Sequence, residues 1–381
     1  MIRIFQDELT NKEQTSLKTH KYKTIDRSLL SFLVFRRYTA MILNYTPTYL
    51  APNLLTMIGY FAMLTNFLVI LVFDPSLREG SPLLSLFSAI CLLIYFTADN
   101  IDGAQARKLN EMSPMGQMFD HGVDSCCVFF CLIALISSFG LRLTFTSLML
   151  ICCVMSGFYL SGLEEKFTGI FEFGYISGPT EGLVLIFIFH LMAAFYKEHV
   201  EKIIIATTLS PQVSQSLNIS NVSPLFLLCF FVAIFNILSS YWKSCRLGDL
   251  KSKTVVTKCY LKTALVFLPL FILHKKLDYS PKLQMINLLI FSQCFSLNYI
   301  EDVFSTIVNS SKRRRNWVFI AYLMFCLSFI FFDVDNYSLG LYTFLTISLS
   351  HYVYNVFLLV KLCKKALKIN VFTLNRKAKT Q

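Results

Sequence analysis

Residues 83–124 read LLSLFSAICLLIYFTADNIDGAQARKLNEMSPMGQMFDHGVD, an apolar run followed by a segment rich in acids and glycines. The opening part, Leu83–Ala98, carries no charge, and similar blocks occur at Leu54–Phe73, Leu225–Tyr241 and Trp317–Phe332. Blocks of about 16 to 20 apolar residues are long enough to cross the roughly 30 Å hydrocarbon core of a bilayer as helices. The sequence therefore predicts a polytopic membrane protein.

The composition of the whole chain agrees with this prediction. Of 381 residues, 55% are hydrophobic and only 15% are charged, whereas a soluble protein carries about 25% charged residues. This excludes an ordinary soluble enzyme and a disordered chain. The net charge of +12 is explained by loops that stay in the cytoplasm, where Lys and Arg accumulate, and we expect no nucleic-acid partner.

The predicted fold class is all-α: a polytopic integral membrane protein with about ten transmembrane helices. The spans are expected at Asn53–Phe73, Leu83–Asp99, Gln117–Phe139, Leu143–Leu163, Gly182–Phe195, Pro224–Trp242, Val255–Leu273, Met285–Val308, Trp317–Phe332 and Leu339–Leu362. An even number of spans places both termini on one side. The basic N-terminal segment, the run Lys312–Arg315 and the basic C-terminal tail assign that side to the cytoplasm. The turn between the second and third spans then faces the cytoplasm too.

Four carboxylates flank this turn, as an i, i+3 pair and an i, i+4 pair: Asp99, Asp102, Asp120 and Asp124. On helices each pair shares a face, with Cβ atoms about 5–6 Å apart. Ionisable groups in a membrane are costly, and like charges at short range in a low dielectric repel strongly. A divalent cation would balance them, and ligands that are all oxygens favour Mg²⁺, Mn²⁺ or Ca²⁺ over zinc. We therefore predict all four aspartates as metal ligands.

Small residues and one arginine lie among these acids. Gly103, Ala106 and Gly116 allow a helix or a phosphorylated ligand to approach the backbone closely. Arg107 presents a planar guanidinium that suits phosphate, and it can also pair with the acids. Metal, phosphate and arginine together suggest phosphoryl transfer.

The spacing Asp99-x2-Asp102-Gly103-x2-Ala106-Arg107-x8-Gly116-x3-Asp120-x3-Asp124 resembles, at every fixed position, the signature of the CDP-alcohol phosphotransferase family. The length and number of spans resemble the eukaryotic choline/ethanolaminephosphotransferase branch. Three further segments are similar to that branch: Leu50-Ala-Pro-Asn53, Phe119-Asp120-His121-Gly122, and Glu164-Glu165 followed by Thr168-Gly169.

The resemblance implies an enzyme in which a diacylglycerol hydroxyl attacks the β-phosphorus of CDP-choline or CDP-ethanolamine, releasing CMP and forming phosphatidylcholine or phosphatidylethanolamine. It implies Mg²⁺ or Mn²⁺ on Asp99, Asp102, Asp120 and Asp124. The residues expected on the substrate are Asn53, Gly103, Ala106, Arg107, Gly116 and Glu164. We expect His121 to be the general base because an imidazole titrates near neutral pH; Asp124 is the alternative base.

These expectations divide the chain into four parts. Residues 1–52 form a cytoplasmic N-terminal arm, which could hold a helix lying in the membrane interface. Residues 53–195 form the catalytic core helices, residues 196–362 the additional transmembrane helices, and residues 363–381 a basic cytoplasmic tail. We expect the protein among the lipids of the endoplasmic reticulum or Golgi membrane, with its active site facing the cytoplasm. The sequence leaves open whether two copies form a homodimer.

Two other functions compete with this one. A CDP-diacylglycerol-dependent phosphatidyltransferase shares the signature but has fewer spans. A cation-coupled transporter would also place acids inside the membrane, although no paired half-repeats with Gly/Pro-broken helices stand out in the sequence.

Overall fold

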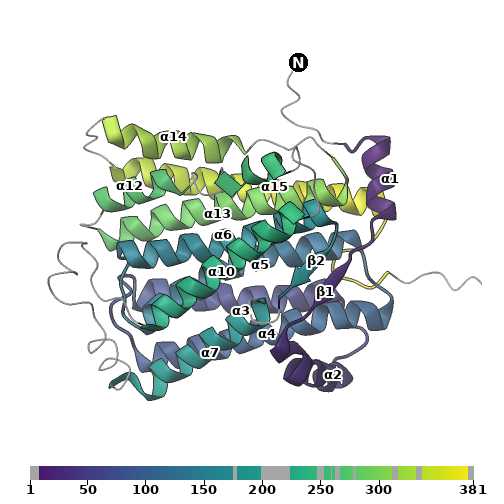
Figure 1. The fold of residues 1–381 in the computed structure, drawn as a ribbon, viewed down its shortest axis with the longest axis horizontal. Helices are drawn as coiled ribbons and strands as arrows, with labels where there is room; N and C mark the ends of the chain where they lie inside the picture. Colours follow the sequence, from purple (N-terminus) through teal and green to yellow (C-terminus); the bar gives the residue numbers. More distant parts are fainter. Residues whose placement is uncertain are drawn as a thin grey trace, which may run out of the picture.

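A computed structural model describes residues 8–174, 178–198, 224–246, 253–258, 260–261, 267–277, 280–310, 316–331 and 337–375. Within these residues the protein is helical apart from one short sheet (Figure 1). The elements are α1 (Asn11–Thr19), β1 (Thr24–Asp26), a π-helical segment (Ser31–Phe35), α2 (Arg36–Tyr45), α3 (Pro52–Phe73), α4 (Pro82–Leu109), α5 (Pro114–Ser138), α6 (Phe145–Thr168), β2 (Phe171–Phe173), α7 (Pro179–Phe195), α10 (Pro224–Arg246), α12 (Leu268–Lys276), α13 (Pro281–Ile307), α14 (Trp317–Phe331) and α15 (Tyr337–Leu367).

The prediction of a polytopic membrane protein is confirmed. In the described part of the chain, seven helices are long and apolar enough to cross a bilayer: α3, α4, α5, α6, α10, α13 and α15. Two shorter apolar helices, Pro179–Phe195 and Trp317–Ser328, coincide with two more predicted spans. The span expected at Val255–Leu273 is described in part: residues 255–258 and 260–261 are helical and α12 begins at Leu268, whereas residues 259 and 262–266 lie outside the described residues.

Three of the long helices start with the same local structure. The helices α4, α5 and α13 each begin with a Ser-Pro pair, in which the serine side chain accepts from a backbone N–H of the first turn. Proline fits the first turn because that position needs no N–H donor, and the serine satisfies one orphan donor. Ser113 accepts in this way from the N–H of Gly116, 3.0 Å away, and so fixes the start of α5 next to the acids.

The end of α4 is equally well defined. Asn110 adopts a left-handed backbone with φ of 56°, and the N–H of Glu111 donates to the carbonyl of Ala106 at 2.9 Å. This six-to-one hydrogen bond is the Schellman ending of a helix. The helix therefore continues about three turns past Asp99, and both halves of the acidic pattern lie on helices joined by a tight turn.

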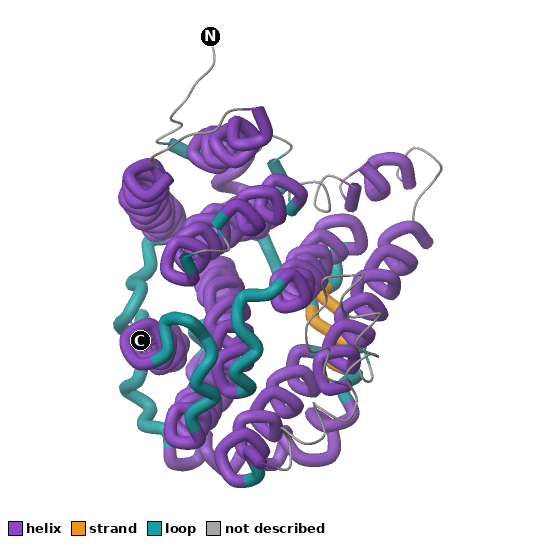
Figure 2. Tube along the Cα trace, turned by 90° about the vertical axis from the view of Figure 1, so that its left-hand side faces the viewer, coloured by secondary structure: helices purple, strands orange, loops and turns teal. Residues whose placement is uncertain are grey.

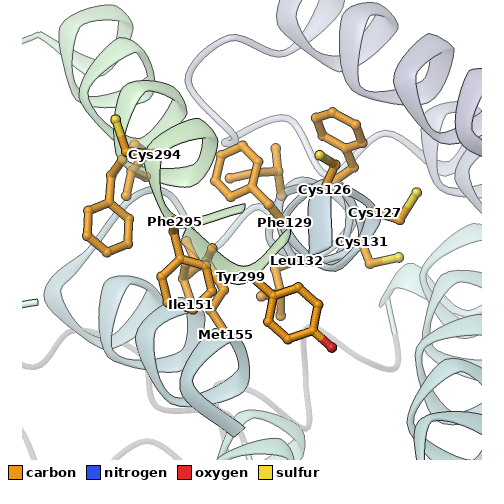
Figure 3. Packing of buried hydrophobic residues seen from close by; sticks show 14 of the residues in the cluster. Cys126, Cys127, Phe129, Cys131, Leu132, Ile151, Met155, Cys294, Phe295 and Tyr299 are labelled. Carbon is orange, nitrogen blue, oxygen red and sulfur yellow. The ribbon is translucent and has the colours of Figure 1, made fainter. Parts of the chain in front are cut away.

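The centre of the bundle is formed by α5 and α13, whose most apolar 18-residue stretches are 78% and 83% buried. Figure 3 shows side chains of α5, α6 and α13 meeting there, among them Phe129, Met155 and Tyr299. Gly162 of α6 has no Cβ, and a methyl group there would lie 2.5 Å from the Tyr299 ring. By contrast, only 17% of the corresponding stretch of α15 is buried, so most of its apolar side chains face outward, as expected for contact with lipid.

Figure 2 views the bundle nearly along its helices. The two strands, which pair in parallel with Thr24 opposite Phe171 and Asp26 opposite Phe173, are the only strands in the described residues. The predicted all-α fold class is confirmed, but the sequence analysis did not anticipate this small sheet. Its effect is to attach the N-terminal arm to the segment between α6 and α7, on the side of the bundle where α4 ends and α5 begins (Figure 1).

Candidate active site

Three of the four predicted metal ligands lie close together. One carboxylate oxygen from each of Asp99, Asp120 and Asp124 lies within 4.8 Å of the others. Asp124 accepts a hydrogen bond from the Tyr95 hydroxyl at 2.6 Å, whereas Oδ1 of Asp120 is buried with no hydrogen-bond partner. A buried carboxylate oxygen without a donor, facing two other acids, is the arrangement that a bound cation completes. These residues therefore fit a divalent metal ion with oxygen ligands.

The fourth predicted ligand, Asp102, is buried and lines the same cavity as the other three aspartates. Its Oδ2 accepts from the Thr56 hydroxyl of α3 at 2.5 Å. This bond attaches α3 to the acidic cluster. Direct ligation by Asp102 stays a prediction.

Two of the small residues of the pattern lie beside side chains that are predicted to bind substrate. A side chain added at Gly103 would begin 3.5 Å from the guanidinium of Arg107, so the arginine lies over this part of α4. A side chain added at Gly116 would begin 3.6 Å from Oδ1 of Asn53. Ala106, in contrast, is not among the residues lining the cavity, and its carbonyl closes the end of α4. Its part in substrate binding stays a prediction.

The residues after α15 return to the same end of the molecule. We call residues 368–375 the C-terminal strap. The side-chain amide of Asn53 donates to the carbonyl of Val371 at 2.8 Å, and Asn375 donates twice to the carboxylate of Glu111, at 2.9 and 2.8 Å. Phe372 packs edge-on against the Phe119 ring, with 5.7 Å between centroids. The strap thus covers the start of α3 and the turn between α4 and α5, and the sequence analysis had assigned these residues only to a basic tail.

His121 is buried between two segments that the sequence analysis did not associate with the site. Its Nε2 lies 3.3 Å from the hydroxyl of Tyr22, and the Phe171 ring lies on it with 5.0 Å between centroids. Tyr22 precedes β1 and Phe171 begins β2, so pairing of the two strands encloses the imidazole. The other imidazole nitrogen, Nδ1, is buried without a hydrogen-bond partner.

Glu164 of α6 forms part of a charged network on the cavity wall. It accepts from Ser240 of α10 at 2.7 Å and pairs with Lys243 at 3.4 Å. Lys243 also lies 3.9 Å from Glu172 of β2, which pairs with Arg27 of the N-terminal arm at 3.3 Å. The network connects α6 and α10 to the small sheet, and both Glu164 and Lys243 face the cavity.

One cavity of about 420 Å³ is lined by the acidic cluster, by His121 and by the pair Glu164 and Lys243. Its polar end is lined by Asp99, Asp102, Arg107, Asp120, His121 and Asp124, together with Tyr22, Glu164 and Lys243. Its other part, which we call the apolar arm, runs between α5, α6, α7 and α10 and is lined by Val128, Leu132, Leu135, Val154, Phe158, Leu183, Ile186 and Val232. Such a cavity can hold a molecule that is ionic at one end and apolar at the other.

Comparisons with known proteins agree with this site. The sequence profile of the CDP-alcohol phosphatidyltransferases matches residues 49–213. The CDP-diacylglycerol--serine O-phosphatidyltransferase of Encephalitozoon cuniculi is 35% identical over 319 residues, which cover 82% of each chain. Choline/ethanolaminephosphotransferase 1 of Saccharomyces cerevisiae is 28% identical over 59% of this chain and 58% of its own length. Cholinephosphotransferase 1 of the same yeast is 30% identical over 64% of this chain and 62% of its own.

The helical bundle and its acidic cavity define an integral membrane enzyme. The chain belongs to the CDP-alcohol phosphatidyltransferase family. It is therefore a transferase of substituted phosphate groups in phospholipid synthesis, and the family acts on CDP-alcohols and lipid substrates with divalent cations.

Proposed function

We propose that this enzyme transfers phosphocholine or phosphoethanolamine from the CDP-alcohol to the hydroxyl of diacylglycerol, releasing CMP. The observation that carries the proposal is the shape of the cavity, in which a buried histidine and an acidic cluster share one space with the apolar arm. Diacylglycerol is almost wholly apolar except for its hydroxyl. Lying along the apolar arm, it would present that hydroxyl to the polar end.

The residues at the polar end supply the rest of the reaction. His121 takes the proton of the diacylglycerol hydroxyl, whose oxygen bonds to the β-phosphorus as the bond from that phosphorus to the CMP oxygen breaks. The free Nδ1 of His121 supports this role over Asp124, which already accepts from Tyr95 and stands in the metal-binding group. Removal of a proton by a positioned side chain contributes about 10²–10⁴-fold to rate.

The donor would be held by the turn between α4 and α5. Arg107 offers a bidentate contact to phosphate, and Gly103 and Gly116 leave room for the diphosphate beside the backbone. Mg²⁺ or Mn²⁺ held by the aspartates would neutralise charge on the diphosphate. We place the site on the cytoplasmic face of an endoplasmic reticulum or Golgi membrane, where a water-soluble nucleotide can reach it.

A second candidate function has support of its own. The relative from E. cuniculi that covers 82% of this chain is named as a CDP-diacylglycerol--serine O-phosphatidyltransferase. In that reaction the lipid is part of the donor and the small alcohol is the acceptor. The apolar arm would then hold the acyl chains of CDP-diacylglycerol, and His121 would deprotonate serine.

A single assay distinguishes the two functions. Purified enzyme in lipid nanodiscs receives Mg²⁺ or Mn²⁺ and either diacylglycerol with CDP-choline or CDP-ethanolamine, or CDP-diacylglycerol with serine, and release of CMP is measured. We expect release with a CDP-aminoalcohol. Release only with CDP-diacylglycerol and serine would establish the second candidate, and no release with any pair would favour a non-enzymatic role such as cation transport. Comparing the two aminoalcohol donors side by side would rank choline against ethanolamine.

A further inference from the structure

The N-terminal arm contributes a side chain that contacts His121 directly. The hydroxyl of Tyr22 lies 3.3 Å from Nε2 of His121, and the two rings meet edge-on at 79° with 5.7 Å between centroids. Tyr22 also lines the cavity. On the other side the Phe171 ring packs against the same imidazole. One polar contact and two aromatic contacts therefore hold the imidazole ring of His121 in place.

We propose that Tyr22 is a positioning residue that holds His121 in the tautomer with its hydrogen on Nε2 and its lone pair on Nδ1. The Tyr22 oxygen accepts the Nε2–H hydrogen bond. The nitrogen left without a partner, Nδ1, then carries the lone pair that takes the proton from the attacking alcohol. Which imidazole nitrogen is protonated is set by the hydrogen bond that the other makes. The inference rests on the proposed role of His121 as the base.

The arm is anchored well enough to act in this way. His20, two residues before Tyr22, hydrogen-bonds Gln117 at 2.9 Å, and Gln117 donates to Glu165 at 2.8 Å. On the other side of Tyr22, β1 pairs with β2. One flank of the tyrosine is thus attached to α5 and through it to α6, and the other flank to β2, so the phenol is held against the imidazole by the fold.

The surroundings of Tyr22 favour a neutral phenol. Burial, with added contributions from the carboxylates of Glu165 and Asp120, raises the pKa of Tyr22. The phenol therefore keeps its own proton. Its oxygen lone pair stays available to the Nε2–H of His121.

The test is a double-mutant cycle on CMP release, using the enzyme in nanodiscs with its active pair of substrates. Tyr22→Phe keeps the ring and removes the hydroxyl. We expect kcat to fall about 5- to 10-fold, the value of one lost hydrogen bond, with the donor KM within about twofold of wild type. In a His121→Ala background the same change should have no further effect, because Tyr22 acts only through the imidazole. The matched control is Tyr38→Phe, which removes another hydroxyl from the arm, bonded to Thr97 at 2.8 Å; it should leave kcat unchanged.

The possible results distinguish the positioning role of Tyr22 from the proposed function. An unchanged kcat in Tyr22→Phe, or an equal fall in the wild-type and His121→Ala backgrounds, overturns the positioning role but leaves the proposed function standing. A His121→Ala enzyme with full turnover overturns the positioning role and the assignment of His121 as the base, which would then pass to Asp124, but leaves the transfer reaction standing. A second readout needs no turnover: the ¹⁵N spectrum of histidine-labelled protein, with the His121 signals identified by their loss in His121→Ala. We expect the Nε2–H tautomer in the wild type and a mixture in Tyr22→Phe, and an Nδ1–H tautomer in the wild type would refute the inference.

Discussion

Neutralising Asp120 should make the metal-free enzyme more stable while removing its activity. One carboxylate oxygen from each of Asp99, Asp120 and Asp124 lies within 4.8 Å of the others. At that separation and an effective dielectric constant of about 20, each pair of charges repels by about 3.5 kcal/mol. Asp120→Asn removes two of the three repulsive pairs, which together amount to about 7 kcal/mol of repulsion. Solvent screening and protonation of the acids reduce this value. Because Oδ1 of Asp120 has no donor to lose, little stabilisation is given up in exchange.

The assay is thermal unfolding of purified protein in nanodiscs, with EDTA or with Mg²⁺ or Mn²⁺. If about 2 kcal/mol of the repulsion is relieved, the melting temperature in EDTA should rise by roughly 2–3 °C, because an unfolding entropy of about 2.1 cal/mol/K per residue over 381 residues gives about 1.2 °C per kcal/mol. Wild type should be stabilised by the metal, because binding to the folded state alone shifts the unfolding equilibrium. Asp120→Asn should show a much smaller metal response, and its CMP release should fall to near background.

The matched control is Asp302→Asn in α13. Asp302 is also buried, but it lies 3.9 Å from the ammonium of Lys166 and accepts a hydrogen bond from Tyr159. Removing its charge breaks an ion pair, so the melting temperature should fall by the same amount with and without metal. If Asp120→Asn instead behaves like Asp302→Asn, losing stability in EDTA and keeping its response to Mg²⁺, the acidic cluster is not a cation site and the reasoning fails.

Three other changes test separate parts of the structure. Val154→Trp should fill part of the apolar arm and raise the KM for long-chain diacylglycerol several-fold with the donor KM unchanged; an equal effect on short-chain lipid would contradict this. Glu111→Ala removes both hydrogen bonds to Asn375, and the loosened C-terminal strap should raise the KM for the CDP-alcohol with kcat nearly unchanged, as measured by CMP release over a range of donor concentrations. Gly162→Ala places a methyl group 2.5 Å from the Tyr299 ring and should destabilise the protein by about 1–3 kcal/mol, whereas Gly182→Ala, with nothing within 4 Å, should not lower the melting temperature in this way.

The sequence analysis predicted best those features that depend on residues close together in the chain. Both ends of α3 and the start of α14 match the predicted spans within one residue, because an uncharged apolar run has few alternatives to a membrane helix. The proximity of Asp99, Asp120 and Asp124 followed from helical spacing on either side of a short turn. The predicted membrane span ends at Asp99, before the end of α4. Hydropathy falls there, but the helix continues to Leu109, since polar residues at a membrane boundary are no obstacle to helical hydrogen bonding.

The residues that enclose the site could not be found in this way, because their partners are distant in sequence. Thr24 pairs with Phe171, and strands of three residues are too short to show an alternating pattern. Likewise Asn53 bonds the carbonyl of Val371, a backbone atom that carries no sequence signal at all. Hydropathy and motif spacing report the chemistry of neighbouring residues, whereas these contacts form because residues 20–26 and 368–375 both return to the side of the bundle where α4 ends and α5 begins.

That return has a consequence for how the site works. Water that reaches the diphosphate would compete with the alcohol as a nucleophile, so the site has to limit the access of water. The helices of a bundle enclose a cavity only from its sides. Here Tyr22 and Phe171 lie against His121 at the polar end of the cavity, and the C-terminal strap lies over Asn53 at the start of α3. We therefore expect hydrolysis of the CDP-alcohol without acceptor to be the activity most sensitive to loosening either segment: Glu111→Ala should raise CMP release in the absence of diacylglycerol, and an enzyme in which that background rate stays at the wild-type level would show that the strap does not exclude water.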